Sequence, residues 1–192
     1  MQLFPVKLNR LALNALFVAG LCACLPLQAQ SSESLLPNSS LEQADGSGDW
    51  PAGWARAKNA TWENEDGNRF IRLTSPAPGA HVVLYQKVPL SMEVRALELT
   101  FKRRISNFTV GEQQWYDARI IMNFITADGK KVSNKRIPYT RRNSDGWETV
   151  TTRFAVPADV VAMEFMPSLF RVDAGTFDLD DVVLKPIDPA EL

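Results

Sequence analysis

The stretch between residues 147 and 184 constrains the fold more than any other part of the chain. It predicts three β-strands, at residues 147–156, 160–172 and 176–184, because runs rich in β-branched and aromatic side chains alternate with short turn segments. The two separating segments, Pro-Ala-Asp and Asp-Ala-Gly, contain residues that favour turns. The domain is therefore expected to close with strands and not with helices.

One acidic residue in the last of these strands is unusual. Alternation places Asp180 on the same face as Val182 and Leu184, with Asp181 on the opposite face. A buried carboxylate is costly unless it is paired or bound to a metal ion. We therefore expect Asp180 to have a specific partner, which is a metal ion, a set of backbone amides or an arginine such as Arg69.

The rest of the chain also predicts strands. Residues 96–105 alternate cleanly, with Leu97, Leu99 and Phe101 inward and polar side chains outward. Asp128 and Gly129 form the expected two-residue turn of a hairpin. Further strands are expected at residues 37–42, 60–64, 70–74, 81–88, 116–126 and 132–139. About ten strands without a convincing helix predict an all-β fold, an antiparallel β-sandwich.

Composition excludes several classes of function. The chain of 192 residues has a formal net charge of −1, so neither nucleic acid nor a strongly charged substrate is expected as a partner. The single histidine, His81, excludes a metal site built from several histidines. Both cysteines, Cys22 and Cys24, lie near the N-terminus, so disulfides are not expected to hold the mature fold together.

The N-terminal residues 1–29 have the pattern of a secretory signal peptide. Lys7 and Arg10 precede an apolar run that is too short for a membrane span, and cleavage is expected after Ala29. The alternative is a lipobox at residues 21–24, which would place a lipid anchor on Cys24. In either case we expect a bacterial protein that is secreted, periplasmic or attached to the cell surface.

Several short motifs occur in a characteristic order between residues 36 and 186. They are NSSLE at 38–42, Trp54 in the next loop, DGNRFIRL at 66–73, VLYQKVPL at 83–90, the strand at 96–102, FITADGK at 124–130, GWE at 146–148 and DDV at 180–182. In this order they resemble the jelly-roll carbohydrate-binding modules of families 4, 9 and 22, which have a galactose-binding-like β-sandwich. The resemblance implies a jelly roll at residues 37–186, with a short leader at 30–36 and a tail at 187–192.

The resemblance also implies a partner for Asp180. Modules of this kind often hold a structural Ca²⁺ between the first and last strands, with a glutamate of the N-terminal motif and an aspartate of the Asp-Asp-Val motif as ligands. Carried over by position, these residues are Glu42 and Asp180. Calcium takes six to eight oxygen ligands, so backbone carbonyls would complete the site.

A saccharide ligand requires exposed aromatic rings together with amide, carboxylate or guanidinium groups. Six side chains are expected to line such a groove: Trp115, Tyr116, Arg119, Asn123, Tyr139 and Lys102. Trp54 and Trp147 are expected to pack, whereas the sequence leaves Trp62 and Tyr85 open between core and groove.

Catalysis is not expected. A glycosidase needs two carboxylates facing each other across a cleft, and the outward acids that can be placed, Glu98, Asp117 and Glu148, show no paired pattern. The sequence therefore favours a non-catalytic module that binds poly- or oligosaccharide, with a glycoside hydrolase or a surface assembly as its partner. The alternative is a cell-surface interaction or structural domain without a glycan ligand.

Overall fold

The computed structural model describes residues 1–2 and 34–192 of the chain. All but the first two residues of the expected signal peptide, the lipobox and both cysteines lie outside these described residues. In the part of the chain that is described, no helix is long and apolar enough to cross a membrane. The residues from Ser34 onward belong to one structural unit.

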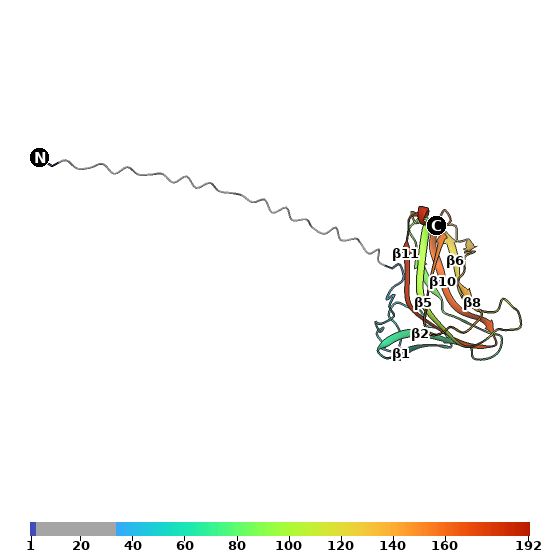
Figure 1. Ribbon diagram of the computed structural model, residues 1–192. Coiled ribbons are helices and arrows are strands. Elements are labelled where there is room, and N and C mark those ends of the chain that lie inside the picture. Colours follow the sequence, from blue (N-terminus) through green and yellow to red (C-terminus); the bar gives the residue numbers. More distant parts are fainter. Residues whose placement is uncertain (3–33) are drawn as a thin grey trace. The chain divides into compact units, whose positions relative to one another are not determined.

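Two antiparallel sheets make up this unit (Figure 1). The five-stranded sheet has the order β1-β2-β11-β5-β9, and its strands are β1 (Ala60–Glu65), β2 (Asn68–Thr74), β11 (Ala174–Pro186), β5 (Ala96–Thr109) and β9 (Glu148–Ala155). Strands that are distant in sequence lie side by side, because β11 pairs with both β2 and β5.

The six-stranded sheet is built around two long central strands, β10 (Val160–Val172) and β6 (Ala118–Thr126). Four short strands flank them: β3 (Ala80–Val83) and β4 (Gln86–Pro89) pair with β10, and β7 (Lys131–Ser133) and β8 (Tyr139–Thr140) pair with β6. A single turn of 3₁₀-helix, η1 (Pro189–Glu191), follows the last strand.

The core lies between the sheets and is formed by alternate side chains of the long strands. Leu97, Leu99 and Phe101 of β5 are buried, as the alternation predicts, and so are Met122 and Phe124 of β6. Burying these large apolar side chains supplies the main favourable contribution to folding. The predicted fold class, an all-β antiparallel jelly-roll sandwich, is confirmed, with eleven strands among the described residues in place of about ten.

The face of Asp180 differs from the expectation because β11 contains a β-bulge. Asp180 pairs with Lys102 but Val183 pairs with Thr100, so β11 has one extra residue there. Asp181 supplies it, with a φ of 46° in the left-handed region. The bulge lets both Leu179 and Val182 face the core, and it turns the Asp180 side chain to the outer face of the five-stranded sheet.

Three predicted strands differ in the structure. Residues 37–42 form a loop and not a strand, because Asn38 and Leu41 have φ values of 43° and 58°. The strand predicted at 81–88 is interrupted at Leu84 and Tyr85, where the Leu84 amide donates to the Pro167 carbonyl oxygen. The strand predicted at 132–139 is two short strands, β7 and β8.

The segment just before the N-terminal loop also belongs to this unit. The Leu35 amide donates to the Leu184 carbonyl oxygen, and the Leu184 amide donates to the Ser34 hydroxyl oxygen. Leu36 is buried in the core. Residues 34–36 therefore pack alongside β11.

Candidate functional site

The outer face of the six-stranded sheet has a polar centre. Since Met122 and Phe124 point into the core, Asn123 between them points outward. Glu164 of β10 lies opposite Asn123 in the antiparallel pairing and shares this outer face. Glu164 is nevertheless only 4% exposed. Neighbouring side chains therefore cover its carboxylate.

Three side chains surround that carboxylate. The Tyr85 hydroxyl donates to Oε1 at 2.8 Å, the Asn123 amide donates to Oε2 at 3.2 Å, and the Lys131 ammonium lies 2.6 Å from Oε1. Tyr85 comes from the break between β3 and β4, and Lys131 comes from β7. We call Tyr85, Asn123, Lys131 and Glu164 the Glu164 network. The Glu164 carboxylate on β10 is thus held by three groups that come from three other segments of the chain.

The network sets the ionisation of its members. Burial acts to raise the pKa of the Glu164 carboxyl, but the hydrogen bonds from Lys131, Tyr85 and Asn123 outweigh burial and lower this pKa. The same contacts with Glu164 raise the pKa of Tyr85 and of Lys131. At neutral pH Glu164 is therefore a carboxylate that accepts hydrogen bonds.

Three exposed aromatic rings lie around the network or toward one end of the same sheet. Tyr85 is 44% exposed, and Trp115 and Tyr139 are each 56% exposed. Tyr139 of β8 pairs with Arg119 of β6, so the two share the outer face. The Arg141 guanidinium lies 5.1 Å from the centroid of the Tyr139 ring. We call the Glu164 network, these rings and Arg119 the Glu164 face.

One end of this face is formed by a row of aromatic rings in edge contact. The row runs from Trp115 to Tyr116 at 6.1 Å, to Phe170 at 5.7 Å and to His81 at 5.0 Å between ring centroids. Two cavities of about 340 and 360 Å³ lie nearby. The first is lined by Pro78, Gly79, Glu112, Tyr116, Arg171 and Asp173, and the second by Val110, Gly111, Glu112, Gln114 and Arg141.

No family model matches the sequence, and no curated protein matches it. Solved structures do match in fold. The family 16 carbohydrate-binding module-2 has 16% identity and a TM-score of 0.53, over 69% of this chain and 90% of that chain. The CBM22-1 xylan-binding domain from Paenibacillus barcinonensis has 10% identity and a TM-score of 0.55, over 83% and 98%. The fold is the jelly-roll β-sandwich that these modules share.

A third module of this kind, TmCBM61 in complex with β-1,4-galactotriose, has 12% identity and a TM-score of 0.51, over 81% of this chain and all of that chain. The jelly roll also matches part of a larger enzyme. It corresponds to 18% of the enzymatically active domain of bacteriophage CBA120 tailspike protein 4, with 15% identity and a TM-score of 0.54 over 70% of this chain. At such identities the likeness shows the fold alone.

Five of the six predicted groove residues lie on or beside the Glu164 face of this jelly roll: Trp115, Tyr116, Arg119, Asn123 and Tyr139. Arg119 is held in place, because its guanidinium donates to the Asp117 carboxylate and to the Trp115 carbonyl oxygen. The Tyr116 hydroxyl accepts a hydrogen bond from Arg171. Among the aromatic residues of the predicted groove, Trp115 and Tyr139 are the most exposed.

Lys102 does not belong with the other five. It lies on β5 of the five-stranded sheet, where its ammonium is 2.7 Å from the Asp181 carboxylate. The prediction that Lys102 faces outward is confirmed, but the outward sides of the two sheets are different surfaces. Alternation along one strand indicates which residues point outward and does not indicate which sheet the strand joins.

Sequence reasoning missed Glu164 and Lys131, and it left Tyr85 undecided. Glu164 did carry a signal, because it is the only acid within the long apolar strand 160–172. A lone carboxylate in such a strand needs partners in the same way as Asp180 does. Lys131 gave no signal, since it follows a hairpin turn in which lysine is unremarkable.

Trp54 and Trp62 have structural roles. Trp54 is 5% exposed and meets the Phe165 ring edge-on, with centroids 6.2 Å apart, so the packing prediction is confirmed. Trp62 donates from Nε1 to the Leu41 carbonyl oxygen and stacks under the Arg69 guanidinium at 4.1 Å. It is partly buried against the core, fixes the N-terminal loop and does not belong to the Glu164 face.

The two expected calcium ligands have other partners. Glu42 Oε1 accepts from the Arg69 amide at 2.9 Å, and Asp180 accepts from Asn68 Nδ2 at 3.0 Å and from the Asp181 amide at 2.7 Å. Within residues 34–192, no three histidine, cysteine or acidic side chains gather in a set suited to a metal ion. Two carboxylates supply fewer oxygen ligands than the six to eight that Ca²⁺ takes, so calcium binding by Glu42 and Asp180 stays a prediction.

Proposed function

We propose that the protein is a non-catalytic carbohydrate-binding module that binds a poly- or oligosaccharide along the Glu164 face. The observation that carries this proposal is the combination of Tyr85, Trp115 and Tyr139, all exposed, with the Glu164 network on a single sheet. Exposed rings offer apolar surface to the C–H faces of sugars. The Asn123 amide and the Lys131 ammonium, which the buried Glu164 carboxylate holds in place, offer fixed partners for hydroxyl groups.

The extent of the face suits a chain and not a single sugar. Along β10, Glu164 and Ser168 are four residues apart, and Ser168 lies opposite Arg119, which in turn pairs with Tyr139. Four residues of strand correspond to about 13 Å. A ligand that contacts both Tyr85 and Tyr139 would therefore span more than one saccharide unit.

The ionisation of Glu164 supports binding without catalysis. A glycosidase needs one carboxyl group with a raised pKa to protonate the leaving group. The pKa of Glu164 is lowered by its partners, and Asp117, toward the other end of the face, is engaged by Arg119 and Arg141. Secretion is part of the proposal and is supported by the signal-peptide pattern of residues 1–29.

Affinity electrophoresis against soluble neutral and acidic polysaccharides tests this function. We expect retardation by at least one polysaccharide, and binding about tenfold weaker in Tyr139→Ala and Trp115→Ala, because each loses an exposed platform. Met92→Ala is the matched control, since Met92 is 57% exposed in the β4–β5 loop, outside the face. Its mobility should equal that of the wild type.

Two results would contradict the proposal. Absence of retardation by every polysaccharide, with a folded protein shown by circular dichroism, would favour a domain that docks onto another protein. Retardation that survives both aromatic substitutions would place the ligand elsewhere on the molecule.

A further inference from the structure

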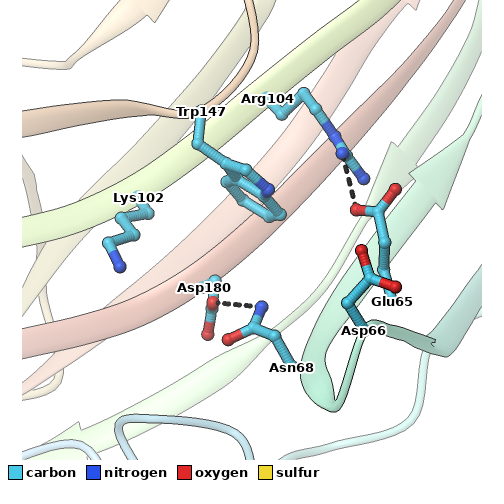
Figure 2. A pocket seen from close by; sticks show the side chains of 7 residues that line it. All are labelled: Glu65, Asp66, Asn68, Lys102, Arg104, Trp147 and Asp180. Carbon is cyan, nitrogen blue, oxygen red and sulfur yellow. Dashed lines mark hydrogen bonds and ion pairs between the residues drawn. The ribbon is translucent and has the colours of Figure 1, made fainter.

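Another cavity lies on the opposite side of the molecule, against the outer face of the five-stranded sheet (Figure 2). Its volume is about 380 Å³, and its lining residues are Glu65, Asp66, Asn68, Lys102, Arg104, Trp147 and Asp180. We call it the Trp147 cavity. These residues come from β1, the β1–β2 turn, β2, β5, β11 and the segment before β9, so strands from across the sheet build it together.

A rigid charged cluster supports one wall of the cavity. Asp178 is fully buried, and it accepts hydrogen bonds from Arg72 Nε at 2.6 Å, Arg72 Nη2 at 2.8 Å and Arg104 Nε at 2.9 Å. Arg104 also reaches Glu65 at 2.7 Å. A buried carboxylate held by two guanidinium groups leaves Arg104 little freedom, so it presents a fixed surface to the cavity.

Trp147 is held in place by its ring contacts. Its ring meets the Phe70 ring edge-on with centroids 5.3 Å apart, and the Arg104 guanidinium lies 4.8 Å from its centroid. Figure 2 shows the indole reaching between Lys102 and Arg104 toward Asp180. The indole is only partly buried, which makes Trp147 a fixed aromatic wall with surface left for a ligand.

The floor is shaped by the bulge in β11. Because Asp181 is the extra residue, Asp180 turns into the cavity, and Asp181 takes Lys102 as its ion-pair partner at 2.7 Å. Asp180 is 1% exposed and is held by Asn68 at 3.0 Å. Among residues 34–192 no cation forms an ion pair with Asp180.

Several polar groups of the lining have unused capacity. No hydrogen bond from the described part of the chain occupies Trp147 Nε1, Asn68 Oδ1 or the Asp66 carboxylate. Lys102 has one carboxylate partner for three N–H donors. Donors and acceptors thus stand together around an aromatic wall. Vicinal hydroxyl groups both donate and accept, so a saccharide is the ligand that this set matches.

We propose that the Trp147 cavity is a second ligand site, which takes a neutral monosaccharide or disaccharide unit such as the end of a glycan chain. Its size supports a short ligand, because about 380 Å³ is near the lower limit of typical small-molecule sites. Its position on the other sheet makes it independent of the Glu164 face. The site goes beyond the proposed function, and either one can exist without the other.

The tryptophan indoles allow the two sites to be observed separately. Trp50, Trp54 and Trp62 each donate from Nε1 to a backbone carbonyl oxygen. Trp115 and Trp147 have no such acceptor among the described residues, and they lie at the Glu164 face and in the Trp147 cavity. In ¹H–¹⁵N spectra of the full chain, Trp115 therefore reports on one site, Trp147 on the other, and the remaining three serve as internal controls.

The test is a titration of labelled protein with glucose, galactose, xylose, cellobiose, lactose and xylobiose. We expect at least one sugar to shift the Trp147 indole signal in a saturable way while the Trp50, Trp54 and Trp62 signals stay in place. Lys102→Met and Asn68→Ala should weaken this binding about tenfold each, since each removes a hydrogen-bonding partner from an exposed position. Trp115→Ala should leave it unchanged.

Three outcomes would overturn the proposal. The first is a Trp147 signal that no sugar moves although the variants and the wild type are folded. The second is a shift caused by Ca²⁺ alone and by no sugar, which would assign the cavity to a metal ion. The third is a sugar-induced shift that disappears in Trp115→Ala, which would make it a remote effect of binding at the Glu164 face.

Discussion

At the scale of single residues, buried acids divide into those with a cationic partner and those without one. Asp178 and Glu164 have arginine or lysine partners. Asp180 is held by an amide side chain and a backbone amide, and its pKa is raised by burial. Because the pKa of Glu164 is lowered and the pKa of Asp180 is raised, these two groups contribute to stability in opposite directions as the pH changes.

Asp180→Asn tests the contribution of this group. A folded-state pKa above the unfolded value of about 3.9 means that the folded protein binds the proton more tightly. The contribution of Asp180 to the free energy of unfolding is therefore fully present below that unfolded value. It is lost as the pH rises through the raised pKa. We expect the unfolding free energy of Asp180→Asn, relative to wild type, to increase from pH 3 to pH 7.

Urea unfolding at several pH values in the presence of EGTA provides the measurement. Asp66→Asn is the control, because Asp66 is exposed in the β1–β2 turn and also lines the Trp147 cavity. A pH profile of Asp180→Asn that is parallel to that of the wild type would disprove the assignment.

At the scale of elements, the bulge of β11 decides which residues face the core. Asp181 has a φ of 46°, which is costly for most side chains and worst for β-branched ones. Asp181→Val should destabilise the protein by about 1 to 2 kcal/mol. Asp181→Gly and Asp181→Asn should each destabilise it by less than about 1 kcal/mol, mainly because the exposed ion pair with Lys102 is lost.

Chemical denaturation of the three variants gives this order directly. Equal stability of Asp181→Val and Asp181→Gly would mean that the bulge relaxes to another residue. The Trp147 cavity would then lose its shape as well, because Asp180 turns outward only while the extra residue stays at position 181.

The same strand shows how far the sequence predicts the elements. The strand at 160–172 has the predicted bounds, and β5 alternates as expected, because a half-buried strand needs period-two patterning. The face of Asp180 was predicted wrongly, since one extra residue reverses the alternation without changing the composition. The strand expected at 37–42 is absent because the backbone turns at Asn38, a residue type that tolerates the left-handed region, and again at the buried Leu41.

The sequence predicted which site residues point outward but not which sheet each of them joins. Trp115, Tyr139, Arg119 and Asn123 follow from outward positions along one part of the chain. Lys102 was assigned to the wrong surface, because sheet membership depends on pairing between strands far apart in sequence. The Glu164 network joins four such segments, and no local pattern connects them.

At the scale of the whole molecule, the predicted calcium ion would connect the N-terminal loop to the sheet. If Glu42 and Asp180 bind Ca²⁺, a concentration 100 times the dissociation constant stabilises the fold by about 2.7 kcal/mol. For a domain of this size, the melting temperature should rise by about 5 to 10 °C. We expect this rise in the wild type and its loss in Glu42→Gln and in Asp180→Asn.

Thermal melting with Ca²⁺, with Mg²⁺ and with EGTA measures this effect. Glu93→Gln is the matched control, since Glu93 is an exposed glutamate in the loop between β4 and β5. Identical melting temperatures of the wild type in Ca²⁺ and in EGTA would rule out a structural calcium ion.

The back-to-back arrangement of the sheets has a mechanical consequence. Stacked sheets lie about 10 Å apart, and their outer faces look in opposite directions. A short saccharide seated on the Glu164 face cannot bend around the sandwich to enter the Trp147 cavity as well. With both faces occupied, one copy of the protein would hold two separate polysaccharide chains and act as a cross-link between them. A viscous polysaccharide solution would then stiffen toward a gel. A protein that binds on one side only would leave the solution fluid at the same concentration.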